Sequence, residues 1–385
     1  MTRKPLRTAR RREALPQALP GADIAAGLRP LLTGWLGAGE WQLWQDRLSE
    51  VPLANRMFLE LHLADGSRSC DIVTSITAGD GSLAAWTSEA ARRTGMIWQK
   101  SARLLEAWRA ELAAGQGALR DLCLMMWFEF DLHPGETMLG EPSLFIALAP
   151  GADIRALAGA LGPFPEWQAA LQRFAGMTVG DGRRAAFAAD GLVLGHIGYM
   201  AGRQGDNEIL PLRSCWRCDD FDHLNWLLTL AAIPVEYRCF ANEFLRLIAL
   251  LSRGNSLMLD LDSQARFLDG FAVEINLFRR DLDDAKRQSA EVLRILRILG
   301  HITPEQASRL ERLTDRAVTP SGRWIYCLLH HVKIRFHQSR AVEVKLYWLT
   351  RVTDHQPLVE PAVGRKPEKE QSWTATVPTE MEQRC

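Results

Sequence analysis

The sequence lacks three features that would place the protein in a specialised class. Its 385 residues carry 46 basic and 46 acidic side chains, so no net positive charge is available for non-specific nucleic-acid binding. It has no run of about 18 apolar residues, which excludes a membrane-spanning helix. Its seven cysteines are odd in number and scattered, unlike the paired set of a small secreted protein. We therefore expect a cytoplasmic protein that neither binds nucleic acid nor spans a membrane.

Motifs of several enzyme classes are also missing. The sequence has no G-x-S-x-G and no H-E-x-x-H motif, and the glycine-rich segment Gly176–Gly182 lacks the Lys-Ser/Thr of a phosphate-binding loop. Cys215 and Cys218 have the spacing of a redox pair or of half a zinc site, but buried thiols are the simpler interpretation. We expect no metal site and no cofactor, with Mg²⁺ left open because Asp260 and Asp262 could present two carboxylates to it.

The composition is that of a soluble globular protein, with 47% hydrophobic and 24% charged residues. Residues 1–21 are predicted to be a flexible tail, because Pro16 and Pro20 lie where a signal sequence would need an apolar stretch. Residues 352–385, rich in Pro, Glu, Lys and Thr, are predicted to be a disordered tail. A single domain should therefore occupy residues 22–351.

Alternation of apolar and polar residues first appears at Met57–Leu63, where Leu59 and Leu61 point one way and Glu60 and His62 the other. A turn follows, and Cys70–Ile76 returns as a second strand. The next segment, Ser82–Ala113, has a helical pattern. Its expected core anchors are Met96, Trp98, Leu104, Leu105 and Trp108.

The same order of hairpin and helix recurs along the chain. Five predicted strand pairs begin near Arg56, Cys123, Leu192, Ser256 and Ile325, at intervals of 67, 69, 64 and 69 residues. The later pairs comprise Leu124–Leu132 with Pro142–Leu148, Leu192–Met200 with Glu208–Arg217, Leu257–Asp262 with Gly270–Leu277, and Ile325–His337 with Ala341–Trp348. The predicted helices are Ala22–Leu48, Asp153–Phe174, Phe221–Ala231, Asn242–Ser252, Asp283–Leu299 and Pro304–Arg316.

Five hairpins give ten antiparallel strands, each with one polar face, and the intervening helices must cover the apolar face. A sheet of this size tends to curl, and closure into a barrel removes both edges. The predicted fold is therefore α+β: a ten-stranded antiparallel β-barrel built from repeated α-β-β-α units, with a ring of helices outside and a polar lumen wide enough for a ligand.

This architecture resembles the aromatic prenyltransferase barrel, the ABBA or PT fold, over about Ala22–Trp348. Locally, Lys345-Leu346-Tyr347 is similar to the Lys-x-Tyr strand motif with which fungal indole prenyltransferases hold the prenyl diphosphate. The resemblance implies a prenyltransferase of specialised metabolism. Its partners would be an allylic diphosphate and an aromatic acceptor, either a small molecule or a peptide side chain.

Basic residues share the predicted inner face of the last hairpin. There Val332, Ile334 and Phe336 take one face, and Lys333 and Arg335 take the other. The same alternation in their own strands places Arg213, Lys345 and Tyr347 on the inner face as well. Because Lys and Arg complement diphosphate charge, these five residues, Arg213, Lys333, Arg335, Lys345 and Tyr347, are the predicted diphosphate-binding set. The alternative is a solvated face on an open sheet.

Acidic and aromatic residues on the same face complete the hypothesis. The resemblance implies a glutamate that accepts the proton of the alkylated ring, and Glu60 and Glu129 are the candidates, with Glu60 preferred. Either could instead be an ion-pair partner of a lumen cation. Trp127 and Tyr199 are the candidates for shielding a carbocation, although four tyrosines in total are few for this family.

Two acidic runs, Asp219–Asp222 and Asp281–Asp284, resemble magnesium motifs but lie where predicted helices begin, so helix capping is the favoured interpretation. Two other functions remain open. One is different chemistry on an anionic substrate within the same barrel, and the other is a non-catalytic carrier or accessory protein. The sequence does not define the acceptor, the prenyl length or the oligomeric state.

Overall fold

The computed structural model describes most of the segments in which strands and helices were expected. The described residues are 21–50, 56–63, 70–78, 81–132, 140–149, 152, 154–161, 165, 168, 193–200, 212–218, 220–230, 256–263, 270–277, 279, 281–337 and 342–354. Most of the predicted tails 1–21 and 352–385 lies outside them, at residues 1–20 and 355–385. The predicted helix Asn242–Ser252 and the segment Gly176–Gly182 also lie outside them.

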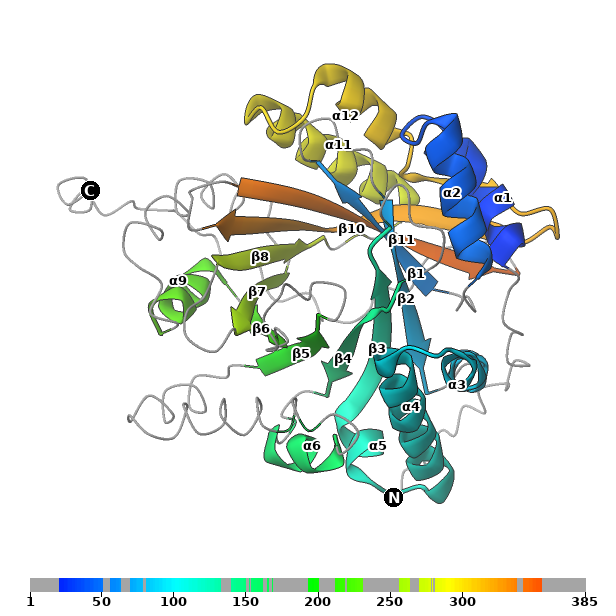
Figure 1. The fold of residues 1–385 in the computed structure, drawn as a ribbon. Coiled ribbons are helices and arrows are strands. Elements are labelled where there is room, and N and C mark those ends of the chain that lie inside the picture. The colour runs from blue at the N-terminus through cyan, green and yellow to red at the C-terminus, as the bar shows by residue number, and fades with distance from the viewer. Residues whose placement is uncertain are drawn as a thin grey trace, which may run out of the picture.

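Ten of the described strands form a closed antiparallel barrel (Figure 1). Each strand pairs with the next, and the ring closes because β11 pairs with both β10 and β1. The predicted ten-stranded barrel is confirmed. Its strands are β1 (Arg56–His62), β2 (Cys70–Thr77), β3 (Cys123–Phe130), β4 (Ser143–Leu148), β5 (Val193–Tyr199), β6 (Leu212–Cys218), β7 (Ser256–Ser263), β8 (Gly270–Asn276), β10 (Trp324–His337) and β11 (Val342–Thr353).

An eleventh strand, β9 (Asp315–Val318), was not expected. It pairs with residues 324–327 of β10, the half of that strand that extends beyond β8. The predicted helix Pro304–Arg316 is therefore too long, because helix α12 (Pro304–Glu311) ends before β9 begins. At the other end of the domain, β11 continues to Thr353, two residues past the predicted end at 351.

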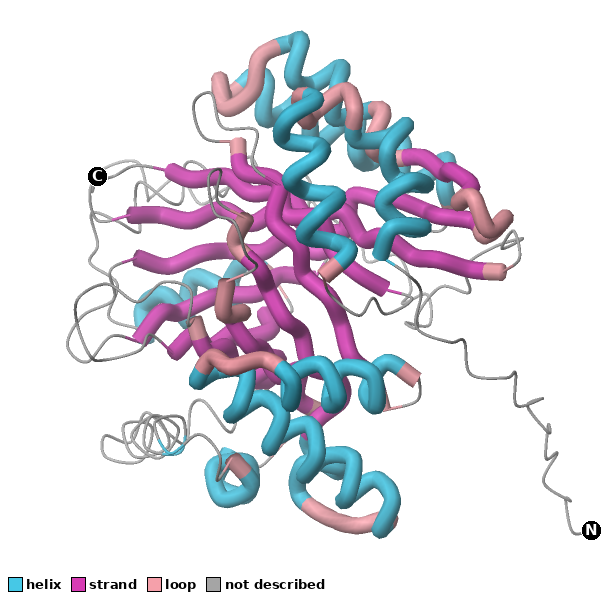
Figure 2. Tube along the Cα trace, turned by 45° about the vertical axis from the view of Figure 1, so that its right-hand side comes forward, coloured by secondary structure: helices cyan, strands magenta, loops and turns pink. Residues whose placement is uncertain are grey.

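Helices lie outside the barrel (Figure 2). Two long helical predictions are each split in the structure. Ala22–Leu48 becomes α1 and α2 around Gly34 and Gly37, and Ser82–Ala113 becomes α3 and α4 around Gly95, because glycine weakens a helix interior. The short helix Ala118–Leu122 was not predicted, and the remaining described helices follow the predicted order. The bounds are α1 (Gly21–Leu32), α2 (Ala38–Ser49), α3 (Ser82–Arg92), α4 (Met96–Ala114), α5 (Ala118–Leu122), α6 (Ile154–Ala160), α9 (Phe221–Leu230) and α11 (Leu282–Ile298).

The main hydrophobic core lies between the barrel wall and these helices. Trp86 of α3 and Trp98 of α4 stack at 6.2 Å with an interplanar angle of 8°, and both pack against Phe128 and Phe130 of β3. Four of the five expected helix anchors are buried, but Met96 is 49% exposed because it is the first residue of α4. The outward faces of the strands therefore anchor the helices, leaving the other faces to line the lumen.

The two acidic runs cap helices, as predicted. Asp281 Oδ1 accepts a hydrogen bond from the Asp284 backbone N–H at 2.8 Å, at the start of α11. Asp220 Oδ1 accepts one from the His223 N–H at 2.8 Å, at the start of α9. These carboxylates satisfy backbone donors that a helix leaves unpaired, which accounts for the acidic clusters without a metal.

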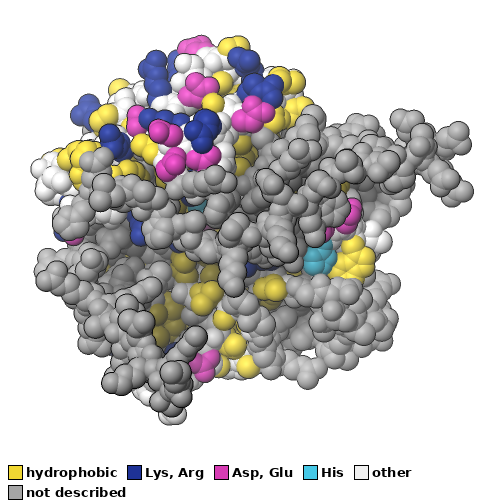
Figure 3. All heavy atoms as spheres, turned by 180° about the vertical axis from the view of Figure 1, so that it is seen from behind, with side chains coloured by type: hydrophobic (Ala, Val, Ile, Leu, Met, Phe, Trp, Pro, Cys, Tyr) yellow, Lys and Arg dark blue, Asp and Glu magenta, His cyan; other side chains and the backbone are white. Residues whose placement is uncertain are grey.

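The outer surface over α11 and α12 carries charges of both signs (Figure 3). Many of them pair within one helix, such as Glu291 with Arg294 and Glu305 with Arg309. This interspersion agrees with the absence of net charge in the sequence. Among the described helices, none has both the length and the apolar character needed to cross a bilayer.

Candidate functional site

The lumen is defined by side-chain alternation around the ring of paired strands. Leu59, Val344 and Leu346 belong to the core shared with the helices, so their neighbours Glu60, Lys345 and Tyr347 face inward. The same alternation places Lys333 and Arg335 inward, between the core residues Val332, Ile334 and Phe336. The predicted parity of the last hairpin is confirmed.

Two lysines lie directly opposite each other on this wall, since Lys333 of β10 pairs with Lys345 of β11. Like charges in such a position destabilise a sheet unless each has a counterion. Lys333 Nζ is hydrogen bonded to Asp260 of β7 and lies 3.0 Å from Glu274 Oε1 of β8. Burial and Arg213 act to lower the pKa of Lys333, but these two carboxylates outweigh them and raise it. Its ammonium group is therefore fully charged.

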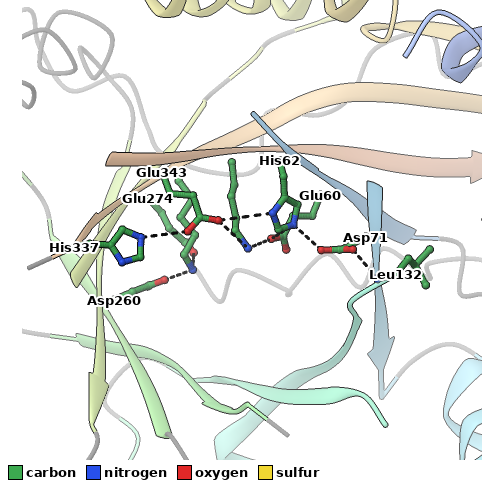
Figure 4. Close-up of polar contacts among 10 residues, drawn as sticks. Glu60, His62, Asp71, Leu132, Asp260, Glu274, His337 and Glu343 are labelled. Carbon is green, nitrogen blue, oxygen red and sulfur yellow. Dashed lines mark hydrogen bonds and ion pairs between the residues drawn. The ribbon is translucent and has the colours of Figure 1, made fainter. Parts of the chain in front are cut away.

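Lys345 belongs to a second cluster, formed mainly by β1, β2 and β11 (Figure 4). Its Nζ lies 2.5 Å from Glu60 Oε1 and 3.8 Å from Glu343 Oε1. His62 Nε2 lies 2.6 Å from Asp71 Oδ2 and 3.3 Å from the same Glu60 oxygen. Burial acts to lower the pKa of His62, but its hydrogen bonds to Asp71 and Glu60 prevail and raise the pKa to about 9.

The two predicted arginines occupy the lumen on either side of the lysines. Arg213 of β6 is buried, and its positive charge acts on both Asp260 and Lys333. Arg335 is half-buried opposite Glu343 and, after Lys345 and His62, contributes to lowering the pKa of that carboxyl against the effect of burial. The wall thus combines the predicted cations with a comparable number of carboxylates.

An aromatic group adjoins the lysine pair. Tyr347 stacks on His331 with ring centroids 4.0 Å apart, and it packs with Phe58, Val73 and Leu349 in a small lumen cluster. Trp127 packs against this cluster and meets His196 edge-on at 4.4 Å. Burial, followed by the charges of Glu60 and Glu129, raises the pKa of Tyr347, so its hydroxyl stays protonated.

The two candidate proton acceptors are both buried in the barrel. Glu60 is 0% exposed and is contacted by Lys345 and His62, whereas Glu129 of β3 is 6% exposed. Glu129 lies opposite Val73 of β2 and Ser143 of β4 and faces the lumen next to Trp127 by strand alternation. Which of the two glutamates accepts the proton therefore stays a prediction.

One sequence interpretation is wrong about the face that a residue takes, and another, that Cys215 and Cys218 are buried thiols, agrees with the structure. Tyr199 points outward into the main core, because its neighbour Gly198 faces Phe145 across the lumen side. Tyr199 therefore has no place in a carbocation shield. Cys215 and Cys218 are three residues apart on β6 and so lie on opposite faces, with Cys218 in the outer core, which excludes a redox or zinc pair.

Sequence reasoning missed Asp71, His196 and Phe58. Asp71 is the one charged residue within the apolar strand Cys70–Thr77, and its parity with Val73 and Ser75 could have placed it in the lumen. His196 follows a register shift on β5, so simple alternation did not indicate which face of the strand it takes. Phe58 shares the parity of Glu60 but looked like part of an apolar run.

Comparisons with known proteins give similarity to solved structures but none to a protein family or a curated sequence. No protein-family model matches the chain, and no curated protein matches it in sequence. Among solved structures, the crystal structure of AnaPT from Neosartorya fischeri is similar with a TM-score of 0.49 and 10% sequence identity. The similarity covers 87% of this chain and 95% of that chain. The site described above therefore rests on the strand pairings and contacts of this chain.

Proposed function

We propose that this protein is an enzyme that transfers an allylic prenyl group from a diphosphate donor to an aromatic acceptor inside the barrel. The observation that carries the proposal is the cross-strand pair Lys333 and Lys345, which adjoins the stacked rings of Tyr347 and His331. Two ammonium groups can stabilise a departing diphosphate, and aromatic faces can stabilise the allylic cation that remains.

The bond changes assign roles to the other lumen residues. The allylic C–O bond breaks and its electron pair leaves with the diphosphate, which Lys333, Lys345 and Arg335 bind. An aromatic carbon of the acceptor then forms a bond to the allylic carbon, and the ring loses a proton to Glu129. Trp127 and Tyr347 line the space in between and exclude water, which would otherwise capture the cation.

The carboxylates beside the lysines set a condition on donor binding. Asp260, Glu274 and Glu60 already neutralise the two ammonium groups, so a diphosphate must exchange with them or arrive with its charge reduced by Mg²⁺. Mg²⁺, which the sequence left open, is thus one of two routes to donor binding in this proposal. It also gives a direct test, since removal of one competing carboxylate should strengthen donor binding.

The same ion pairs favour a second candidate function, in which the barrel binds an uncharged aromatic compound without prenyl transfer. In that case the lysines serve only as partners of the carboxylates, and Trp127 and Tyr347 form the binding surface. Such a protein would bind aromatic compounds but show no saturable response to any allylic diphosphate.

The deciding experiment is calorimetric titration of the full chain with a non-hydrolysable dimethylallyl or geranyl diphosphate analogue, with and without Mg²⁺. We expect Lys345→Gln to weaken binding about 10- to 100-fold, as loss of a charge-assisted hydrogen bond predicts. Glu274→Gln should tighten it severalfold, because Lys333 then keeps only Asp260. Lys286→Gln, which removes an exposed ion pair with Asp315 on the outer surface, is the matched control and should have no effect.

Turnover separates binding from chemistry. With dimethylallyl diphosphate and a panel of indoles and phenols, Glu129→Gln should retain donor binding and slow product formation by about 100-fold or more, as loss of a catalytic base does. Absence of saturable diphosphate binding by the wild type, with or without Mg²⁺, would overturn the proposal. Binding of aromatic compounds alone would then support the second candidate.

A further inference from the structure

One group of lumen residues takes no part in the bond changes of the proposed transfer, although its member Glu60 competes for Lys345. Glu60, His62 and Asp71 come from the adjacent strands β1 and β2, and one donor atom from each lies within 4.8 Å of the others. Glu60 is 0% exposed and Asp71 3% exposed, so their carboxylates have little water to stabilise them. Their charge must be balanced within the protein.

The two carboxylates converge on a single atom, His62 Nε2, at 2.6 Å from Asp71 and 3.3 Å from Glu60. An imidazole nitrogen with a bare lone pair would repel two ionised carboxylates, so with both acids ionised Nε2 carries either a proton or a metal ion in this position. Donor atoms of a tetrahedral zinc site with bonds of about 2.0–2.1 Å are separated by about 3.3 Å. The Glu60 separation already has this value, and the Asp71 oxygen would have to move outward.

The surroundings also have the arrangement that supports metal ligands. The other ring nitrogen of His62, Nδ1, faces Glu343 Oε1 at 3.7 Å, and a carboxylate in that position orients a metal-binding histidine. The second oxygen of Asp71 accepts a hydrogen bond from the Leu132 N–H at 2.8 Å. Asp71 therefore has an outer partner that fixes its orientation, and His62 has a carboxylate near its second ring nitrogen (Figure 4).

The local charge leaves room for a divalent ion. Three carboxylates, those of Glu60, Asp71 and Glu343, surround one ammonium group and one imidazolium, leaving one negative charge. Arg335 opposite Glu343 and Asp131 beside Asp71 offset each other. Replacement of the His62 proton by a divalent ion would bring the sum to zero.

We propose that Glu60, His62 and Asp71 form a binding site for a divalent transition-metal ion of the Zn²⁺ class, with an open position toward the lumen. Lys345, which now contacts Glu60, would move toward Glu343, its second carboxylate at 3.8 Å. One imidazole with two carboxylates is a donor set that Zn²⁺ accepts, and three protein ligands leave a fourth position for water or substrate. The site does not depend on prenyl transfer.

The experiment is titration of chelator-treated full-length protein with Zn²⁺ alone, followed by calorimetry, with no organic substrate present. We expect one equivalent to bind, and we expect His62→Gln and Asp71→Asn each to weaken binding by about 100-fold or more. Glu343→Gln, which removes the outer partner of His62, should weaken it about 10-fold. His337→Gln is the matched control: it removes a histidine that also faces Glu343, at 3.5 Å, but lies outside the cluster.

A second measurement protects the test from misfolded variants and from cysteine binding. Substitution with Co²⁺ in the wild type should give visible bands of nitrogen and oxygen ligation, with no thiolate charge-transfer band, and Asp71→Asn should abolish them. The proposal is overturned by a thiolate band, by the absence of saturable Zn²⁺ binding, or by unchanged binding in both ligand variants. Because no diphosphate is present, failure of prenyl transfer leaves these outcomes unaffected.

Discussion

The charged residues of the lumen are arranged in groups rather than as a basic wall. Lys333 and Lys345 each contact two carboxylates, and the acids that serve them come from β1, β7, β8 and β11. Burial makes an unpaired charge costly, so this matching is what allows charged residues to line a barrel interior. Any anionic substrate has to compete with these carboxylates for the two lysines.

The histidines of the lumen predict how stability depends on pH. Burial lowers the pKa of His196 and of His331 to about 3, against a value of 6.5 in the unfolded chain. Between these values the unfolded state binds the proton and the folded state does not, so these two histidines leave stability unchanged above pH 6.5 and reduce it as the pH decreases, opposite to His62 with its raised pKa. At pH 5 the loss should reach about 2 kcal/mol for each histidine.

Urea unfolding at pH 7.5 and pH 5 measures this effect. His196→Asn and His331→Asn should each reduce the difference in unfolding free energy between the two pH values by up to about 2 kcal/mol. For each variant we compare its unfolding free energies at the two pH values with each other. The cost of the lost ring contact is the same at both pH values and therefore cancels. An unchanged difference in both variants would contradict the assignment of neutral, buried histidines.

At the scale of elements, local signals located most helices and strands but misjudged some of their ends. The alternating pattern of β1, β2, β10 and β11 predicted these strands to within a few residues. The pattern from residue 304 onward did not reveal that α12 gives way to β9, because β9 is only four residues long and is stabilised by pairing with β10. Tertiary pairing there overrides a weak local preference.

The cap of α11 gives a prediction at this scale. Asp281→Ala removes the side-chain oxygen that accepts from the Asp284 N–H, and it should reduce the free energy of unfolding by about 1 kcal/mol. Urea denaturation at neutral pH measures it. Asp283→Ala is the matched control, since it removes the same side chain from the same exposed turn without removing the cap, and it should cost only a few tenths of a kcal/mol. Equal losses would contradict the capping role.

For the whole molecule, closure of the barrel is the central feature. The first and last barrel strands, β1 and β11, pair along seven residues of β1, so neither is an edge. This pairing brings Glu60 and Lys345 together across 285 positions of sequence. Closure also places Glu343 beside His62, so it completes the surroundings of the proposed metal site, whose three ligands come from the β1–β2 hairpin.

Amide hydrogen exchange tests closure directly. We expect the amides of β1 and β11 to exchange as slowly as those of β3 and β4, to within about tenfold, because closure pairs them on both sides. The short strand β9 is the internal control, since it pairs only with β10 and should exchange faster. Fast exchange along alternate amides of both β1 and β11 would indicate an open sheet.

The sequence alone determined which face each residue of a regular strand takes. Alternation is a property of the extended backbone, so Leu59 against Glu60, and Val344 against Lys345, could be assigned without knowing any partner strand. The assignment failed at Tyr199 because β5 contains a register shift, and because Gly195 and Gly198 carry no side chain that would mark a face.

Only the tertiary structure decided what each inward residue meets. The sequence predicted Lys333 and Lys345 as diphosphate-binding residues. In the structure both contact carboxylates that come from other hairpins, which the sequence did not indicate. Asp71 gained its place beside His62 from the pairing of β1 with β2, and Glu343 reached the same histidine through closure. Alternation is fixed by local geometry, whereas contacts across the lumen depend on the register and closure of the whole ring.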